Sequence, residues 1–153
     1  LYVTEPVRGV SSREERSAAV QGCAAALGAP LQARVFENPA DDPDGLDAAL
    51  RQLRGQPRPA VFCGNAIITL RVAAAAARLD CRLGQDLGLI GFDETEWAPL
   101  VGPGLSTLAQ PTDELGRHAT RCLLERLQGL APPPRQILLP ATLVARGSTL
   151  SPT

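Results

Sequence analysis

Three polar side chains of this sequence stand where a small polar ligand could be bound. Asp93 directly follows the apolar run 87–92, Asn65 follows the apolar run 60–63, and Arg16 lies early in a helical segment. A carboxylate, an amide and a guanidinium together can bind vicinal hydroxyls and a carboxylate. A sugar or sugar acid needs such a set, because its polar groups must be paired once they leave water.

Each of these residues also has a purely structural interpretation. Asn65 could have no role beyond capping the helix that follows it. Asp93 could simply start a turn, and Arg16 could be an exposed helix residue. Trp97, the only tryptophan, could stack on a sugar ring or pack its loop onto the core. The shared position of the first three at one edge of a sheet favours a binding site.

Other chemistries have less support in the sequence. Glu94 and Glu96 could work with Asp93 as acid–base carboxylates of a small α/β enzyme, but an exposed charged loop also accounts for them. His118 has no Ser or Cys at a recognisable motif spacing and is expected at a surface or interface. No glycine-rich phosphate-binding motif is present. We therefore expect no catalytic residue, no metal and no cofactor.

The elements that position these residues alternate along the chain. Strands are expected over residues 1–4, 31–37, 60–63, 87–92 and 106–109, and helices over 11–27, 45–54, 66–79 and 113–127. Ser11 or Ser12 is expected to cap the first helix. Strands alternating with helices predict right-handed βαβ units, a mostly parallel sheet and a three-layer αβα fold of the α/β class.

The last third of the chain departs from this alternation. A proline-rich connector at 132–134 precedes two expected strands, 136–139 and 142–145, with no helix between them. Such an ending suggests that the chain leaves the main sheet and comes back to it.

The composition is that of an ordinary globular protein, with 44% hydrophobic and 20% charged residues among 153. A net charge of -1 does not indicate that this chain itself binds nucleic acid or an anionic membrane.

No apolar run approaches the roughly 18 residues of a membrane span. Four scattered cysteines are expected to be unpaired thiols in a reducing compartment. Because the chain lacks Met, we expect that upstream residues have been removed.

Four ordered motifs resemble the lactose-repressor/galactose-repressor family of bacterial transcription factors. They are Ser12-Arg-Glu-Glu-Arg16, Phe62-Cys-Gly-Asn65, Gly91-Phe-Asp93-Glu-Thr and Leu139-Pro-Ala-Thr-Leu-Val-Ala-Arg-Gly-Ser148. The resemblance implies one lobe of a periplasmic-binding-protein-like fold. Residues 1–110 would form the C-terminal lobe of an effector-binding core, 111–134 a crossover helix and linker of the other lobe, and 135–153 terminal strands that return.

The same resemblance assigns roles to residues. Arg16, Asn65 and Asp93 become effector contacts, and Thr112 becomes a hinge-side contact. The family usually has an acid after the asparagine, where this chain has Ala66, so one hydroxyl acceptor is missing. The passages 11–16 and 96–104 look most like regulators of gluconate or ketogluconate use. A sugar acid would suit Arg16, with help from Arg13.

The resemblance also implies the setting in which the chain works. It would be the ligand-sensing part of a cytoplasmic, homodimeric repressor that binds operator DNA through helix-turn-helix segments outside this chain, without catalysis. Helix 113–127 would then expose an apolar stripe, or bury it by dimerisation or by folding onto the lobe. The alternative is a periplasmic sugar-binding protein for transport, which shares the fold. The scattered cysteines and the closing Arg-Gly-Ser pattern count against that alternative.

Overall fold

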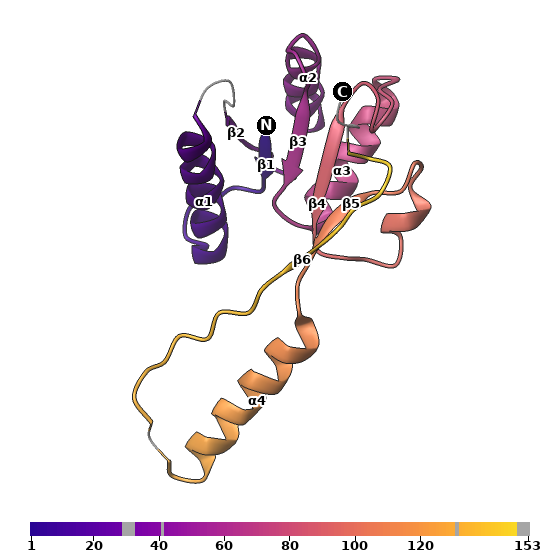
Figure 1. Ribbon diagram of the computed structural model, residues 1–153. Coiled ribbons are helices and arrows are strands. Elements are labelled where there is room, and N and C mark those ends of the chain that lie inside the picture. The colour runs from indigo at the N-terminus through magenta and orange to yellow at the C-terminus, as the bar shows by residue number, and fades with distance from the viewer. Residues whose placement is uncertain (29–32, 41, 131, 150–153) are drawn as a thin grey trace.

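Six short strands form a single sheet in the computed structural model, which describes residues 1–28, 33–40, 42–130 and 132–149 (Figure 1). The order across the sheet is β2-β1-β3-β4-β5-β6. The strands are β1 (Tyr2–Thr4), β2 (Val35–Glu37), β3 (Ala60–Cys63), β4 (Gly88–Phe92), β5 (Ser106–Ala109) and β6 (Thr142–Val144). Neighbours are parallel except β5 and β6, which are antiparallel. The predicted mostly parallel α/β sheet is therefore confirmed.

The helices cover both faces of this sheet. They are α1 (Ser11–Leu27), α2 (Pro43–Arg54), α3 (Ala66–Arg78) and α4 (Thr112–Leu127), with a short 3-10 turn, η1 (Ala98–Leu100). The chain steps outward from β1 to β2 and then back across to β3 and β4. Right-handed crossovers then place α1 on one face and α2 with α3 on the other, and α2 packs against α3. The first three helices and the sheet make the three expected layers.

The core is built mainly from aliphatic side chains of the central strands and of α2 and α3. Val3, Val61 and Leu89 of the sheet are buried, as are Leu46 and Ile68 of the helices. The alanines of α3 let the helix approach the sheet closely, and its buried members are Ala73, Ala75 and Ala76. Close packing of this kind holds the carboxyl ends of β3 and β4 in a fixed relation.

The cap of α1 and the start of α2 differ from the sequence expectation. Neither Ser11 nor Ser12 caps α1: the N-cap position is Val10, which has no capping side chain. Glu14 instead reaches back and accepts a hydrogen bond from the Gly9 N–H at 3.1 Å. Helix α2 begins two residues earlier than predicted, because Asp42 caps it and a proline fills its first position. The early part of the predicted strand 31–37 includes residues 31 and 32, which lie outside the described residues.

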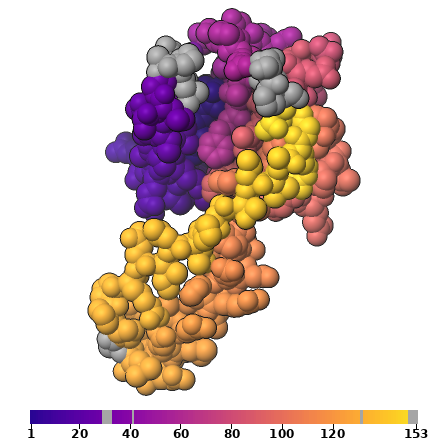
Figure 2. Space-filling model, viewed as in Figure 1, coloured from indigo at the N-terminus to yellow at the C-terminus, as the bar shows by residue number. Residues whose placement is uncertain are grey.

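An arm projects from the sheet, made of α4 and the segment that follows it up to β6 (Figures 1 and 2). None of the residues of α4 is buried. Its leucines are open to solvent, with Leu127 73% and Leu123 58% exposed. Of the outcomes expected for this helix, the structure therefore shows the exposed apolar stripe.

The predicted strand 136–139 is wrong, because this part of the arm is irregular. A strand needs a neighbour for its backbone hydrogen bonds, and within the described residues no strand lies beside this segment. It is tied to α4 instead, through an ion pair of 2.5 Å between Arg135 and Glu125. The second predicted strand, 142–145, is confirmed as β6.

The four cysteines are free thiols. Cys63 at the end of β3 is fully buried, and burial raises the pKa of its thiol to about 12. In the part of the chain that the structure describes, no helix is long and apolar enough to cross a membrane.

Candidate functional site

The turn between β3 and α3, residues 64–66, brings the three predicted ligand residues together. We call it the β3–α3 junction. Arg16 Nη1 donates to the carbonyl of Gly64 at 2.9 Å, and the Ala66 N–H donates to Asp93 Oδ2 at 3.3 Å. Asn65 lies between these two contacts. A guanidinium from α1, an amide and a carboxylate thus meet at the carboxyl edge of the sheet, where the sequence placed them.

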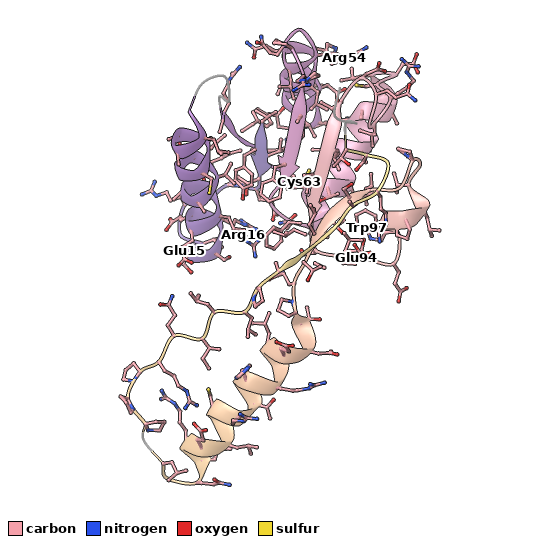
Figure 3. All side chains as sticks on the ribbon, in the orientation of Figure 1. Glu15, Arg16, Arg54, Cys63, Glu94 and Trp97 are labelled. Carbon is pink, nitrogen blue, oxygen red and sulfur yellow. The ribbon has the colours of Figure 1, made fainter. Side chains whose placement is uncertain are left out.

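Arg16 is held by a ring as well as by a carbonyl. Its guanidinium lies over the ring of Phe92, 4.0 Å from the centroid, and the side chain points from α1 toward the carboxyl edge (Figure 3). A cation over an aromatic face is attracted by the ring quadrupole. Among the described residues, no carboxylate forms an ion pair with Arg16. The site therefore holds a fixed guanidinium whose charge is not balanced by a paired acid.

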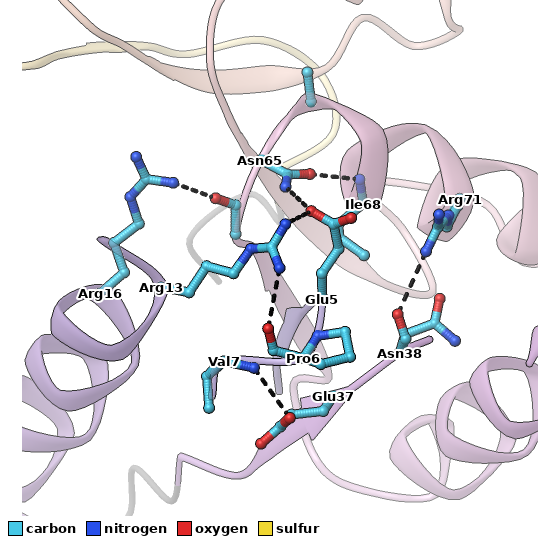
Figure 4. A network of polar contacts seen from close by, with 12 residues as sticks. Glu5, Pro6, Val7, Arg13, Arg16, Glu37, Asn38, Asn65, Ile68 and Arg71 are labelled. Atoms are coloured by element: carbon cyan, nitrogen blue, oxygen red, sulfur yellow. Dashed lines mark hydrogen bonds and ion pairs between the residues drawn. The ribbon is translucent and has the colours of Figure 1, made fainter. Parts of the chain in front are cut away.

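Asn65 does cap α3, as one of its two interpretations requires, but the cap uses only part of the amide. Its Oδ1 accepts the Ile68 N–H at 2.9 Å. Its Nδ2 donates to Glu5 Oε2 at 2.7 Å, and Glu5 also pairs with Arg13 at 2.6 Å (Figure 4). Arg13 was expected to help Arg16 bind the carboxylate of a sugar acid. Because Arg13 already pairs with Glu5, a ligand carboxylate would have to compete with Glu5 for it.

Asp93 is fixed in an unusual backbone conformation at the end of β4. Its φ is +75°, a region that costs a non-glycine residue about 1–2 kcal/mol. Two contacts hold it there: the side chain of Gln110 donates to Asp93 Oδ1, and the Asp93 N–H donates to the Leu108 carbonyl at 3.1 Å. Leu108 lies in β5 and Gln110 directly follows it, so the end of this neighbouring strand orients the acid.

Glu94, the next residue, pairs with Arg146 in the C-terminal segment that follows β6. Arg146 donates to its two oxygens, at 3.0 Å from Nη1 and 2.5 Å from Nη2, and Thr107 donates a further hydrogen bond. The Arg146 guanidinium lowers the pKa of the Glu94 carboxyl below its ordinary value. A carboxylate held charged by an arginine is a poor general acid, which weakens the acid–base alternative for residues 93–96.

Residues 1–149 match the family described as periplasmic binding protein-like domain. The chain belongs to this family. It is 44% identical over 151 residues to the HTH-type transcriptional regulator PtxS of Pseudomonas aeruginosa, covering 97% of this chain and 43% of that protein. The chain thus spans less than half the length of the curated relatives it matches.

Solved structures of the lactose-repressor family carry the same fold. A dimeric Lac repressor with an 11-residue C-terminal deletion superposes with a TM-score of 0.79 at 27% identity, over 99% of this chain and 56% of that one. A LacI family transcriptional regulator from Arthrobacter sp. FB24, solved in complex with lactose, gives 0.74 at 29% identity, over 97% and 57%. The resemblance drawn from the four sequence motifs is confirmed.

The remaining predicted residues of this periplasmic binding protein-like domain are Trp97, Thr112 and His118. Trp97 is partly buried and packs against the hydrophobic core, which is one of its two sequence interpretations. Thr112 is exposed and is the first residue of α4. His118 is half-buried on α4. A contact of Trp97 or Thr112 with ligand stays a prediction.

Three residues of the site were not singled out from the sequence. Glu5 follows β1 directly, so the strand-end argument used for Asn65 and Asp93 could have found it. Phe92 and Gln110 gave no such signal, because their roles depend on contacts with Arg16 and Asp93 that only the folded chain reveals.

A groove of about 310 Å³ lies on the surface of this fold. That groove is lined by α3 and residues 101–103, among them Ala73, Ala77 and Pro103. None of Arg16, Asn65 and Asp93 lines it.

The Glu94–Arg146 pair is expected to make stability depend on pH. The pKa of Glu94 is lowered in the folded state, so its contribution is present above the unfolded pKa of about 4.3 and is lost as the pH falls below it. We expect wild type to exceed Glu94→Gln in urea midpoint at about pH 6, and this advantage to shrink steadily as the pH is lowered below about 4. An advantage that persists or grows at the lower pH would show that the ion pair is not its source.

Proposed function

We propose that this chain is the ligand-sensing part of a DNA-binding transcriptional regulator, and that it binds a small sugar or sugar acid at the β3–α3 junction. The observation that carries the proposal is the convergence of Arg16, Asn65 and Asp93 on three consecutive residues. The names of the relatives support it, since one is an HTH-type transcriptional regulator and another was solved with lactose.

Each residue has a defined part in such binding. Arg16 offers guanidinium donors to a carboxylate or to hydroxyls, and the Asp93 carboxylate accepts from hydroxyls. Asn65 has one N–H and one lone pair left after its two bonds in the protein. Thr112 and Trp97 would add contacts from the arm and from the loop after β4.

The arm belongs, in this proposal, to a second lobe that closes over the site. Residues 1–110 form one lobe, 111–134 cross to the other, and 135–153 return. The exposed leucines of α4 support this division, because an apolar stripe of this kind is normally buried against a partner. A ligand that bridges both lobes would favour one relative orientation, with a coupling equal to its difference in affinity for the two states.

The whole protein would be a cytoplasmic homodimer that holds or releases a two-fold operator through helix-turn-helix segments outside this chain. The dimeric Lac repressor neighbour supports the assembly. No catalysis is part of the proposal. A periplasmic transport protein remains the rival, since it shares the fold, but the relatives are named as transcriptional regulators.

Calorimetry and a DNA-binding assay test the proposal together. The whole gene product that contains this chain is titrated with a panel of sugars and sugar acids, and its operator affinity is measured with and without each one. We expect at least one compound to bind and to change operator affinity. Binding without any effect on DNA would favour the transport protein, and turnover of a bound compound would favour the enzyme.

A further inference from the structure

We propose that Glu5 sets the orientation of the Asn65 amide and so prepares the site for its ligand. The inference rests on the proposed function, because it gives Glu5 a role at the same site. Glu5 follows β1, and its carboxylate lies between α1 and the β3–α3 junction (Figure 4). Its Oε2 accepts hydrogen bonds from Asn65 Nδ2 at 2.7 Å and from Arg13 Nη2 at 2.6 Å.

The contacts of Asn65 allow its amide a single orientation. Oδ1 accepts the Ile68 N–H, and Nδ2 faces the Glu5 carboxylate. A flip of the amide would set its NH2 group against the Ile68 N–H and its oxygen against a carboxylate oxygen, and both pairs would repel. The N–H and the lone pair that remain for a ligand therefore have directions that are fixed before binding. Binding loses less free energy when the contact groups are already ordered.

The charge of Glu5 does not oppose an anionic ligand, because Arg13 neutralises it. The two side chains are 21% and 28% exposed, and Arg13 is held further by a bond of 3.0 Å to the Pro6 carbonyl. Arg16 keeps its own charge for a ligand, since within the described residues it has no ion pair. Glu5 is thus a positioning residue, which acts through Asn65.

The binding test uses two matched probes, D-gluconate and D-glucose, titrated into the whole gene product. Glu5→Ala should weaken each probe that binds wild type by about tenfold, the scale of one hydrogen bond that is no longer made. Glu5→Gln keeps an acceptor for Asn65 and should restore affinity to within about threefold of wild type. Glu37→Ala is the matched control: among the described residues the Glu37 side chain accepts only the Val7 N–H, at 3.1 Å, so this substitution should leave affinity unchanged.

A double-mutant cycle separates positioning from general destabilisation. In an Asn65→Ala background, Glu5→Ala should have no further effect on affinity, because the group it orients is gone. An equal loss of affinity with and without Asn65 would overturn the inference, as would a failure of Glu5→Gln to rescue when its melting temperature matches wild type.

A second readout needs no ligand. The side-chain amide NMR signals of Asn65, assigned by their loss in Asn65→Ala, should shift in Glu5→Ala and stay in place in Glu37→Ala. Unchanged signals in Glu5→Ala would overturn the inference whether or not either probe binds. If the signals shift but neither probe binds wild type, the orienting role of Glu5 is supported while the proposed function fails for these probes.

Discussion

Replacement of Arg16 by alanine is expected to lower the affinity of the whole gene product for the proposed sugar or sugar-acid effector by about a hundredfold. Hydrogen bonds from a charged donor contribute about 1.5–3 kcal/mol each, and every 1.4 kcal/mol is tenfold in affinity. The Phe92 ring and the Gly64 carbonyl hold this guanidinium in place, so little of its binding free energy is spent on ordering it. Calorimetry should show a dissociation constant about a hundredfold higher than that of wild type.

Two further variants make the result specific. Arg16→Lys keeps the charge but loses the planar guanidinium, which stacks on the Phe92 ring and can donate two parallel hydrogen bonds to a carboxylate. Its affinity should therefore fall between those of wild type and Arg16→Ala. Arg8→Ala removes an exposed arginine shortly before α1 and should bind like wild type. Retained affinity in Arg16→Ala would remove Arg16 from the site and with it the main support for the proposed function.

A second large effect is expected on stability, at Gly84. Its φ is +80°, and a Cβ there would lie 1.9 Å from the carbonyl oxygen of Gly147. Gly84→Ala should therefore lower the free energy of unfolding by more than about 3 kcal/mol, since it combines a left-handed backbone with a clash against main chain. Urea unfolding followed by circular dichroism measures this directly.

Gly22 supplies a control with the same chemical change. It lies inside α1, and a Cβ there would meet nothing within 4 Å. Gly22→Ala should raise stability by about 0.5–1 kcal/mol, because alanine loses less conformational entropy in a helix. If both substitutions shifted the midpoint in the same direction, the close contact between Gly84 and Gly147 would not be what limits this position.

The sequence predicted the place of the site better than its contacts. Apolar runs followed by Asn65 and Asp93 were sufficient, because in a parallel sheet the ends of such runs must share an edge. The partners were not predictable in this way. Glu5 and Asn65 are 60 residues apart, and no local pattern records that their side chains meet.

Two errors have a similar physical origin. The run at 136–139 has strand-like residues, but a strand forms only beside another one, and the sequence does not say whether a neighbour is there. Ser11 and Ser12 are good caps in general, yet they are the first two residues of α1, and Glu14 accepts the Gly9 N–H from inside the helix. In both places the preference of the local residues for a strand or a cap was overridden by contacts with other parts of the chain.

The antiparallel pairing of β5 with β6 has a mechanical consequence. The two strands that connect the sheet to the arm lie side by side, so they form a narrow ribbon and not two separate connections. A ribbon flexes readily across its thin direction and resists bending in its own plane, so the arm should swing about one preferred axis. Gln110 is the first residue after β5 and donates a hydrogen bond to Asp93. Each such movement of the arm would therefore shift Gln110 and change the position of the Asp93 carboxylate.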